Sequence, residues 1–251
     1  MTSTDAPLAL AQLTLATDLD GTFAHGSPAV RHALIQALTD APDTCLLYVT
    51  GRSTEAWQHL ATAAGLPTPD VAITDVGTEV ADGRTGTPLA AFDHPIADWP
   101  GRGEVRGRLA DLPLVEQPLA ARWRVSYEFQ NGYAADVVAT ARQRLLDLAV
   151  DVLPSADTYL DILPRGINKG TTLLRVLAHL GRPHERVVVA GDSLNDLALF
   201  ESGLKGIVVG NAEPGLRTAV AGLTGLYFAA AEGVEGLVEG LNHFMTRQMA
   251  R

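Results

Sequence analysis

Residues 13–22 read Leu-Thr-Leu-Ala-Thr-Asp-Leu-Asp-Gly-Thr, a short apolar run that ends in two carboxylates, Asp18 and Asp20. The run before Asp18 is rich in β-forming residues and the stretch is bounded by a glycine, which predicts a buried strand. The two acids then lie at the carboxyl end of that strand, where open α/β sheets bind their ligands. An ordinary Asp-Gly turn is the alternative interpretation of so short a motif.

The spacing of these two acids has a chemical consequence. Carboxylates this close repel each other, and a divalent cation relieves the repulsion. Mg²⁺ accepts one or two carboxylates together with phosphate oxygens of a substrate, and an aspartate can itself attack phosphorus as a nucleophile. Whether this stretch forms such a site depends on the groups that the remaining chain brings to the same place.

Composition excludes several classes of protein. The chain has 251 residues, of which 47% are hydrophobic, enough for one large domain or two small ones. Its 29 acidic and 19 basic side chains give a net charge of −10, which argues against nucleic acid as a partner. Residues 1–12 have no signal-peptide pattern, and no apolar run approaches the ~20 residues of a membrane span. We therefore expect a cytoplasmic protein without a membrane partner; the oligomeric state is not readable from the sequence.

The chain order predicts two domains. Apolar strands alternate with amphipathic helices up to about residue 83 and again from residue 165, which is the rhythm of a doubly wound parallel sheet. Between them, residues 84–164 form a less regular segment with turn signals and a partly alternating strand at 122–129. The predicted fold is an α/β core of residues 1–83 and 165–251 with an inserted α+β cap of residues 84–164.

Besides Asp18 and Asp20, polar side chains occupy three further positions at the ends of predicted core elements. Thr50 ends the strand at 45–49, Lys169 opens a helix, and Asp192 ends the strongly apolar strand at 186–190. A lysine at a helix start is disfavoured by the helix dipole, which favours a functional role over a solvated side chain. Each residue alone also fits a capping or surface role. Parallel strands place their carboxyl ends along one edge of a sheet, so the set can converge on Asp18.

In this order and with these residue types, the chain resembles the haloacid dehalogenase (HAD) superfamily of phosphotransferases. All four signature motifs of that superfamily are present, and the insertion has the position of a type C2 cap and the α+β pattern of subfamily IIB. Several strings look most like sucrose-phosphate phosphatases. These strings are Thr50-Gly51-Arg52-Ser53, Val76-Gly-Thr-Glu79, Asp161-Ile-Leu-Pro164 with Lys169-Gly170, and Gly210-Asn211-Ala212. The four superfamily motifs are Asp18-Leu-Asp20-Gly-Thr22, Thr50 in Thr-Gly-Arg, Lys169 in Asn-Lys-Gly, and Gly191-Asp192-Ser-Leu-Asn195-Asp196.

The resemblance implies a role for each core residue. Asp18 is the expected nucleophile and Asp20 the expected general acid and base, while Thr50 and Lys169 hold the transferring phosphoryl oxygens. The implied cofactor is Mg²⁺, bound by Asp18, by the backbone carbonyl of Asp20 and by Asp192. Asp196, with Asn195, is expected to orient Lys169 and the metal-bound waters. The expected substrate-binding residues are Gly51, Arg52, Ser53, Glu79 and Asn195, although Arg52 and Ser53 also fit a purely structural role.

The predicted function is Mg²⁺-dependent hydrolysis of a small-molecule phosphorylated sugar through an aspartyl-phosphate. A disaccharide phosphate such as sucrose 6-phosphate is the first candidate, and mannosyl-3-phosphoglycerate or another glycosyl or sugar phosphate is the alternative. A phosphohexomutase on the same scaffold is an alternative of another class, and a non-catalytic sugar-binding module is a weaker one. Within the cap, Arg122, Arg124 and Tyr127 are candidate sugar or carboxylate contacts.

Overall fold

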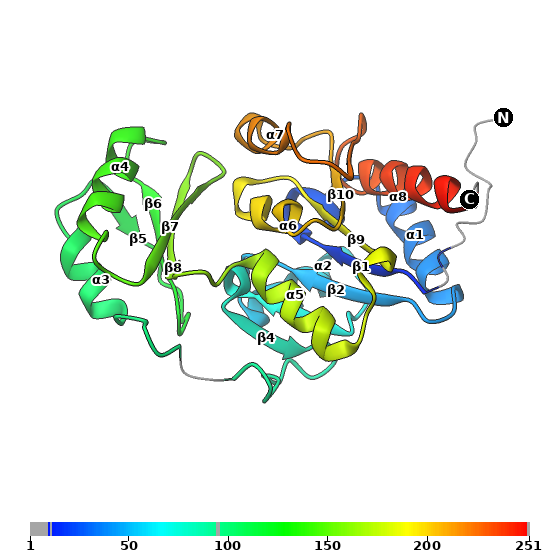
Figure 1. Cartoon of the computed structure of the whole chain (residues 1–251), viewed down its shortest axis with the longest axis horizontal. Helices are drawn as coiled ribbons and strands as arrows, with labels where there is room; N and C mark the ends of the chain where they lie inside the picture. The colour runs from blue at the N-terminus through cyan, green and yellow to red at the C-terminus, as the bar shows by residue number, and fades with distance from the viewer. Residues whose placement is uncertain (1–9, 11, 94–95, 250–251) are drawn as a thin grey trace.

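The structure is a computed structural model that describes residues 10, 12–93 and 96–249, and it contains two sheets, one in each lobe of the molecule (Figure 1). The predicted lack of a signal peptide concerns residues 1–12, most of which lie outside the described residues. In the part of the chain that is described, no helix has the length and apolar character that crossing a bilayer requires.

The larger sheet has seven strands and belongs to the core. Its order is β11-β10-β9-β1-β2-β3-β4, parallel throughout except for β4, which runs antiparallel to β3 at one edge. β1 is the central strand, paired with β2 on one side and β9 on the other. The strands are β1 (Thr14–Thr17), β2 (Cys45–Val49), β3 (Val71–Thr74), β4 (Glu79–Asp82), β9 (Val187–Gly191), β10 (Lys205–Val208) and β11 (Leu226–Phe228).

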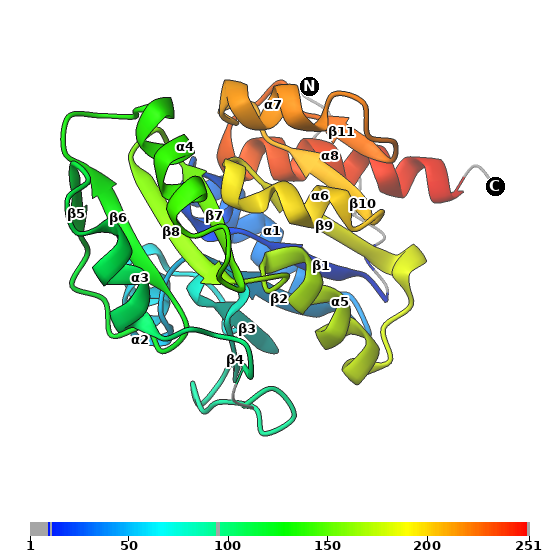
Figure 2. The same ribbon diagram turned by 60° about the vertical axis from the view of Figure 1, so that its left-hand side comes forward.

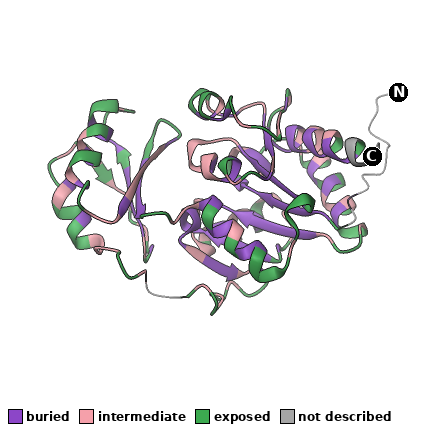
Figure 3. Cartoon of the chain, in the orientation of Figure 1, coloured by how far each residue is buried: buried purple, intermediate pink, exposed green. Residues whose placement is uncertain are grey.

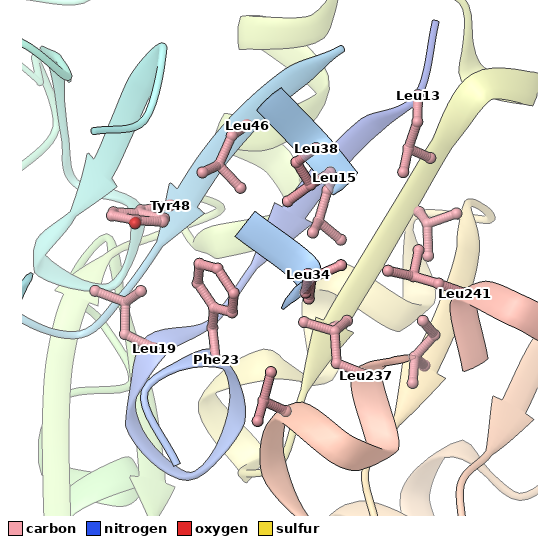
Figure 4. Packing of buried hydrophobic residues seen from close by; sticks show 14 of the residues in the cluster. Leu13, Leu15, Leu19, Phe23, Leu34, Leu38, Leu46, Tyr48, Leu237 and Leu241 are labelled. Carbon is pink, nitrogen blue, oxygen red and sulfur yellow. The ribbon is translucent and has the colours of Figure 1, made fainter. Parts of the chain in front are cut away.

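Helices cover both faces of this sheet, as a doubly wound fold requires (Figure 2). One hydrophobic cluster packs α1 (Pro28–Asp40), α2 (Thr54–Ala64) and α8 (Gly233–Met249) onto the sheet. Figure 4 shows part of it, with Leu34 and Leu38 of α1 lying between Tyr48 on one side and Leu237 and Leu241 of α8 on the other. The other cluster uses α5 (Lys169–Leu180), α6 (Leu197–Glu201) and α7 (Pro214–Val220). The predicted α/β core is confirmed.

The second sheet belongs to the smaller lobe. It is antiparallel, with the order β5-β6-β8-β7, and it shares a hydrophobic cluster with α3 (Arg102–Leu109) and α4 (Ala135–Arg144). Buried residues concentrate on the larger sheet and on two strands of the smaller one, Val125–Phe129 and Tyr159–Pro164 (Figure 3). The strands are β5 (Leu114–Glu116), β6 (Val125–Phe129), β7 (Val150–Ser155) and β8 (Tyr159–Pro164). β4 and β5 are not among the strands that the sequence predicts, and β6 begins three residues later than predicted.

We propose that residues 84–164 form a cap domain on a core of residues 1–83 and 165–251, because β4 ends at Asp82 and β8 ends at Pro164. Packing refines the first boundary. Leu89 and Phe92 pack against the core cluster, and the Leu89 amide donates to Val80. A crossing placed after Phe92 therefore follows the packing better than one at Gly83.

The turn after β3 packs closely against the start of α5, beside the insertion. Gly77, in the short turn after β3, lies so close to Asn168 that a Cβ at this position would stand 2.3 Å from the Asn168 carbonyl carbon. The Thr172 hydroxyl of α5 donates to the Gly77 carbonyl at 2.6 Å. Asn168 caps α5, since its side chain accepts from the Thr171 amide at 2.9 Å. The first turn of α5, which carries Lys169, is thereby fixed against the sheet.

Candidate active site

The carboxyl ends of the three central strands bring the predicted residues together. Asp18 follows β1, and its amide donates to the Ala190 carbonyl of β9 at 2.9 Å. Thr50 follows β2 and Asp192 follows β9, and Thr17 at the end of β1 pairs with Tyr48 of β2 and with Ala190 of β9. Asp18, Thr50 and Lys169 are all buried. Residues separated by as many as 174 positions along the chain therefore share one edge of the sheet, as the topology predicts.

Lys169 is the positive charge at the centre of this site. Its ammonium lies 2.8 Å from Asp18 Oδ1 and 2.6 Å from Asp196 Oδ1, and the side chain has no exposed surface. Burial alone would lower the pKa of Lys169, but the two carboxylates outweigh it and raise that pKa. The lysine is therefore fully charged and held in place by an ion pair on each side.

Asp18, Asp192 and Asp196 form an acidic group whose ligand atoms all lie within 4.8 Å of one another. Burial raises the pKa of Asp18, and burial together with the Asp196 carboxylate raises the pKa of Asp192 to about 7. Three carboxylates facing one ammonium leave two uncompensated negative charges, which a divalent cation would balance. Buried acids whose pKa values rise in the absence of a cation have the electrostatics of a metal site.

The three acids are not equivalent as ligands. Asp196 gives one oxygen to Lys169, and its other oxygen accepts from the backbone amides of Asp192 and Ser193 at 3.0 and 3.1 Å. Its lone pairs are engaged by the lysine and by the amides of the loop. Asp18 and Asp192 keep oxygens available, and the residues present fit the predicted Mg²⁺ set.

A glycine makes room for the Asp192 carboxylate. Gly21 has a φ of +71°, and a Cβ built there would lie 2.1 Å from Asp192 Oδ2. The Thr22 hydroxyl donates to Asp192 Oδ1 at 3.2 Å. Asn211 supports the same loop, since its side chain donates to the Gly21 carbonyl and accepts from the Gly233 amide, both at 2.8 Å. The loop after β1 is thus shaped around Asp192 and fastened to the start of α8.

Arg52 makes a contact that the sequence does not reveal. Its guanidinium forms a two-pronged ion pair with Asp20, Nε to Oδ2 and Nη2 to Oδ1, each at 2.7 Å. This hydrogen bond is the main reason that the pKa of Arg52 is raised. The Thr50 hydroxyl accepts from the Arg52 amide at 3.1 Å, which leaves its own proton free to be donated. Arg52 was predicted to contact the substrate, and here it contacts the predicted general acid and base.

The remaining predicted substrate residues have different surroundings. Ser53 caps α2, with its hydroxyl accepting from the Ala56 amide at 3.3 Å, which is the structural role left open by the sequence. Gly51 lies beside Asn195, whose Nδ2 would be 3.8 Å from a Cβ on that glycine. Asn195 Oδ1 is buried and has no hydrogen-bond partner among the described residues, so it is available to a ligand.

Two cavities adjoin these residues at the border of core and cap. Glu79 is half-buried on β4, and it lines a cavity of about 60 Å³ with Arg122 and Trp123. Burial, followed by the charge of Asp75, raises the pKa of Glu79. Asn195 lines a larger cavity of about 470 Å³, most of which is bounded by α4, β7, α6 and their neighbouring loops.

Two of the candidate cap contacts are placed elsewhere. Arg124 is 5% exposed and pairs with Asp75 of the core at 2.7 Å and with Asp161 of the cap at 3.5 Å. Tyr127 is 5% exposed in the hydrophobic cluster of the cap. Neither side chain is available to a sugar in this structure, so both expectations are wrong for it. The alternating sequence pattern of the strand does not indicate that Arg124 has buried acidic partners on other elements.

Sequence reasoning missed Glu213, which joins the β7–β8 hairpin to the loop that follows β9. It precedes α7, and its carboxylate accepts from the Leu194 amide at 3.2 Å and from the Ala156 amide at 2.9 Å. Leu194 belongs to the loop between Asp192 and Asp196, and Ala156 lies at the tip of the β7–β8 hairpin. Glu213 stands beside the proline that starts α7, and no motif marks it.

Comparisons with known proteins find relatives that match most of this chain. The family model of sucrose-6F-phosphate phosphohydrolase matches residues 11–245. Glucosylglycerol-phosphate synthase of Pseudomonas anguilliseptica is 38% identical over 92% of this chain, which spans 30% of that relative's length. Mannosylfructose-phosphate phosphatase of Agrobacterium fabrum is 29% identical, with 92% and 96% of the two chains covered. The crystal structure of the sucrose-phosphatase from Synechocystis sp. PCC6803, in complex with sucrose and phosphate, has a TM-score of 0.86 and 28% identity, with 93% and 98% coverage.

Proposed function

The chain belongs to the sucrose-6F-phosphate phosphohydrolase family of the haloacid dehalogenase superfamily, and we propose that it hydrolyses a phosphorylated sugar with Mg²⁺ as cofactor. The observation that carries the proposal is the placement of Asp18. This buried carboxylate has one oxygen held by Lys169 at 2.8 Å, and it shares an acidic group with Asp192. A carboxylate fixed in this way is oriented for attack on a phosphorus atom placed at the end of β1.

The proposed reaction has two steps. In the first, an Asp18 oxygen attacks phosphorus, the bond from phosphorus to the sugar oxygen breaks, and Asp20 gives its proton to that oxygen. In the second, water attacks the aspartyl-phosphate, Asp20 takes a proton from the water, and the bond from phosphorus to Asp18 breaks. The Thr50 hydroxyl and the Lys169 ammonium would hold the transferring phosphoryl oxygens.

Mg²⁺ would be held by side-chain oxygens of Asp18 and Asp192 and by the Asp20 backbone carbonyl. When bound, it would offset the negative charge of the phosphate and of the buried carboxylates. Asp196 would keep Lys169 and the loop of Asp192 in position, since it already bonds to both. Asn195, with its unpartnered oxygen, would orient a water or a substrate hydroxyl at the edge of the site.

A disaccharide phosphate of the sucrose 6-phosphate type is the first substrate we propose. The matching family model is that of sucrose-6F-phosphate phosphohydrolase, and the structural relative is a sucrose-phosphatase. A glucosylglycerol phosphate is a second candidate, because a relative named for that compound is 38% identical to this chain. A mannosylfructose phosphate or mannosyl-3-phosphoglycerate is a third. We further propose a cytoplasmic location, where phosphorylated sugars are made and consumed.

The test is phosphate release from this panel of substrates with Mg²⁺, with chelator, and with the Asp18→Asn variant. We expect release that needs Mg²⁺, that is lost in Asp18→Asn, and that is fastest with one glycosyl phosphate, which then names the substrate. A hexose 1-phosphate and its 6-phosphate isomer belong in the panel. Interconversion of these two without phosphate release would overturn the phosphatase proposal in favour of a mutase, and sugar binding without turnover would favour a binding module.

A further inference from the structure

Asp20 and Arg52 form a two-pronged ion pair that adds little to the stability of the fold. The guanidinium fork covers both carboxylate oxygens at 2.7 Å, yet the two side chains are 54% and 37% exposed. Ion pairs exposed to this extent contribute little to stability. A two-pronged arginine contact fixes direction as well as distance, because guanidinium and carboxylate are both planar. The pair therefore fixes the plane and position of the Asp20 carboxylate.

Both ends of this pair stand on fixed backbone. At Arg52, the amide donates to the Thr50 hydroxyl at 3.1 Å, and the carbonyl accepts from the Asp75 amide at 2.9 Å. At the other end, Asp20 precedes Gly21, whose carbonyl accepts from Asn211. Because the backbone is held at both ends, the two side chains start from fixed positions, and the two-pronged contact then sets the orientation of the Asp20 carboxylate.

The same observations separate Asp20 from the buried charges. Lys169 bonds to Asp18 and Asp196, while both oxygens of Asp20 accept from Arg52. The Asp20 carboxylate is also not part of the acidic group that could hold a metal among the described residues. Arg52 is thus the partner that holds Asp20 apart from that group, on the exposed side of the site.

We infer that Arg52 is a positioning residue that orients Asp20 for the second step of the reaction, the attack of water on the aspartyl-phosphate. In that step Asp20 accepts a proton from water. The water oxygen forms a bond to phosphorus, and the bond from phosphorus to Asp18 breaks. No reactant other than water is required. The inference rests on the proposed function, and it assigns Arg52 to the carboxylate rather than to the sugar.

A substrate with a good leaving group isolates the second step. p-Nitrophenolate leaves without being protonated, so the first step with p-nitrophenyl phosphate does not depend on Asp20. We expect Arg52→Gln, mixed rapidly with this substrate and Mg²⁺, to release about one nitrophenolate per enzyme in a burst. Steady turnover should then be slowed about tenfold to a hundredfold, since correctly placed general bases contribute factors of this size or larger.

Three variants serve as comparisons. Asp20→Asn should give the same burst, and combining it with Arg52→Gln should slow turnover little further, because the two act as a unit. Arg52→Lys should restore part of the turnover, because it keeps the charge but loses the fork. Arg84→Gln removes an exposed arginine outside the site and should match the wild type.

The outcomes separate cleanly. A raised KM for Arg52→Gln with unchanged kcat and no burst would overturn the inference and make Arg52 a substrate contact. Slowed turnover without a burst would also overturn it, because the first step would then be the one affected. A wild type that releases no nitrophenolate and no phosphate from any sugar phosphate would instead overturn the proposed function.

Discussion

The Lys169 ammonium lies 2.6 Å from Asp196 Oδ1, and neither side chain has any exposed surface. Lys169→Met would leave the acidic group without its internal cation. Removing one partner of a buried ion pair typically destabilises a protein by about 3–5 kcal/mol, so we expect a loss of that size in the free energy of unfolding, together with loss of turnover. Urea unfolding and phosphate release measure the two effects.

Asp196→Asn is the matched control for that variant, because it keeps the shape of the side chain and removes one charge. We expect activity to fall by about ten- to a hundredfold, as for other groups that orient a catalytic residue or metal ligand, with the fold retained. Equal stability of Lys169→Met and the wild type would contradict the assignment of Lys169 as a charged, buried partner.

Gly21 is predicted to support metal binding, because it leaves room for the Asp192 carboxylate. Gly21→Ala would place a Cβ 2.1 Å from Asp192 Oδ2 and would displace that carboxylate. Gly65→Ala is the control, because Gly65 has a similar φ of +63° and nothing within 4 Å of its Cβ position. Both variants should lose about 1 kcal/mol from the backbone conformation.

Titration calorimetry with Mg²⁺ distinguishes the two glycine variants. We expect Mg²⁺ affinity to fall by about tenfold or more in Gly21→Ala and to stay at the wild-type value in Gly65→Ala. Equal affinity in both would show that the Asp192 carboxylate can move aside without cost, and that it is a poor candidate for a metal ligand.

The buried Arg124–Asp75 pair between cap and core is predicted to be costly to break. Burial raises the pKa of Asp75 despite the arginine beside it, so desolvation outweighs the attraction. Arg124→Met should therefore destabilise the protein by about 3–5 kcal/mol, because it leaves a buried carboxylate unpaired. The double variant Arg124→Met with Asp75→Asn should recover part of that loss, since Asp75 is then neutral and Asp161 is the buried carboxylate that still lacks the arginine.

Arg122 provides the surface comparison. It pairs with Asp93, with both side chains about half-exposed, and Arg122→Met should change stability by less than about 1 kcal/mol. Urea unfolding of all three variants checks the contrast. Equal effects of Arg122→Met and Arg124→Met would contradict the view that Arg124 is a buried link between the two sheets.

Stability without metal should fall as the pH rises. The pKa of Asp192 is about 7 in the folded protein, above its value of about 4 when unfolded. The folded state thus binds the additional proton between these pH values, and the free energy of unfolding decreases as the pH rises through them. With chelator present, we expect a decrease on the order of 2 kcal/mol between about pH 5 and pH 8.

Two controls accompany this measurement. Mg²⁺ should restore stability at the higher pH, because it binds the ionised carboxylates of the folded state. Asp192→Asn should show a flatter profile than the wild type. A metal-free protein whose unfolding midpoint in urea is the same at both pH values would contradict a raised pKa at Asp192.

The parts of this fold that could be predicted from the sequence are those in which neighbouring residues alone determine the secondary structure and its burial. Val187 to Ala190 are apolar and β-branched or small, so a buried strand follows directly, and the polar residues after it must lie at a sheet edge. For this reason the sequence predicts that four polar residues converge, namely Asp18, Thr50, Lys169 and Asp192. The order of strands and helices then determined the fold class.

The parts that escaped prediction depend on partners distant in sequence. Arg124 appears as one more polar residue of an alternating strand, and its burial is understandable only beside Asp75 and Asp161. Arg52 was expected at the substrate, because nothing in the string Thr-Gly-Arg-Ser shows that Asp20 lies within 2.7 Å. β4 was not predicted, because the hydrophobic pattern of four residues after a turn is too short to indicate an antiparallel edge strand.

The close approach of Gly77 to Asn168 has an evolutionary consequence. We propose that the chain leaves the core after Phe92, beyond the edge strand β4 that follows Gly77, and returns immediately before Asn168, so that two connections join the long insertion to the core. Such a segment can be exchanged as a module, because shortening or replacing it leaves the strands that carry the reacting groups where they are. A lineage could thereby change which sugar its enzyme recognises while inheriting the machinery of phosphate transfer unaltered.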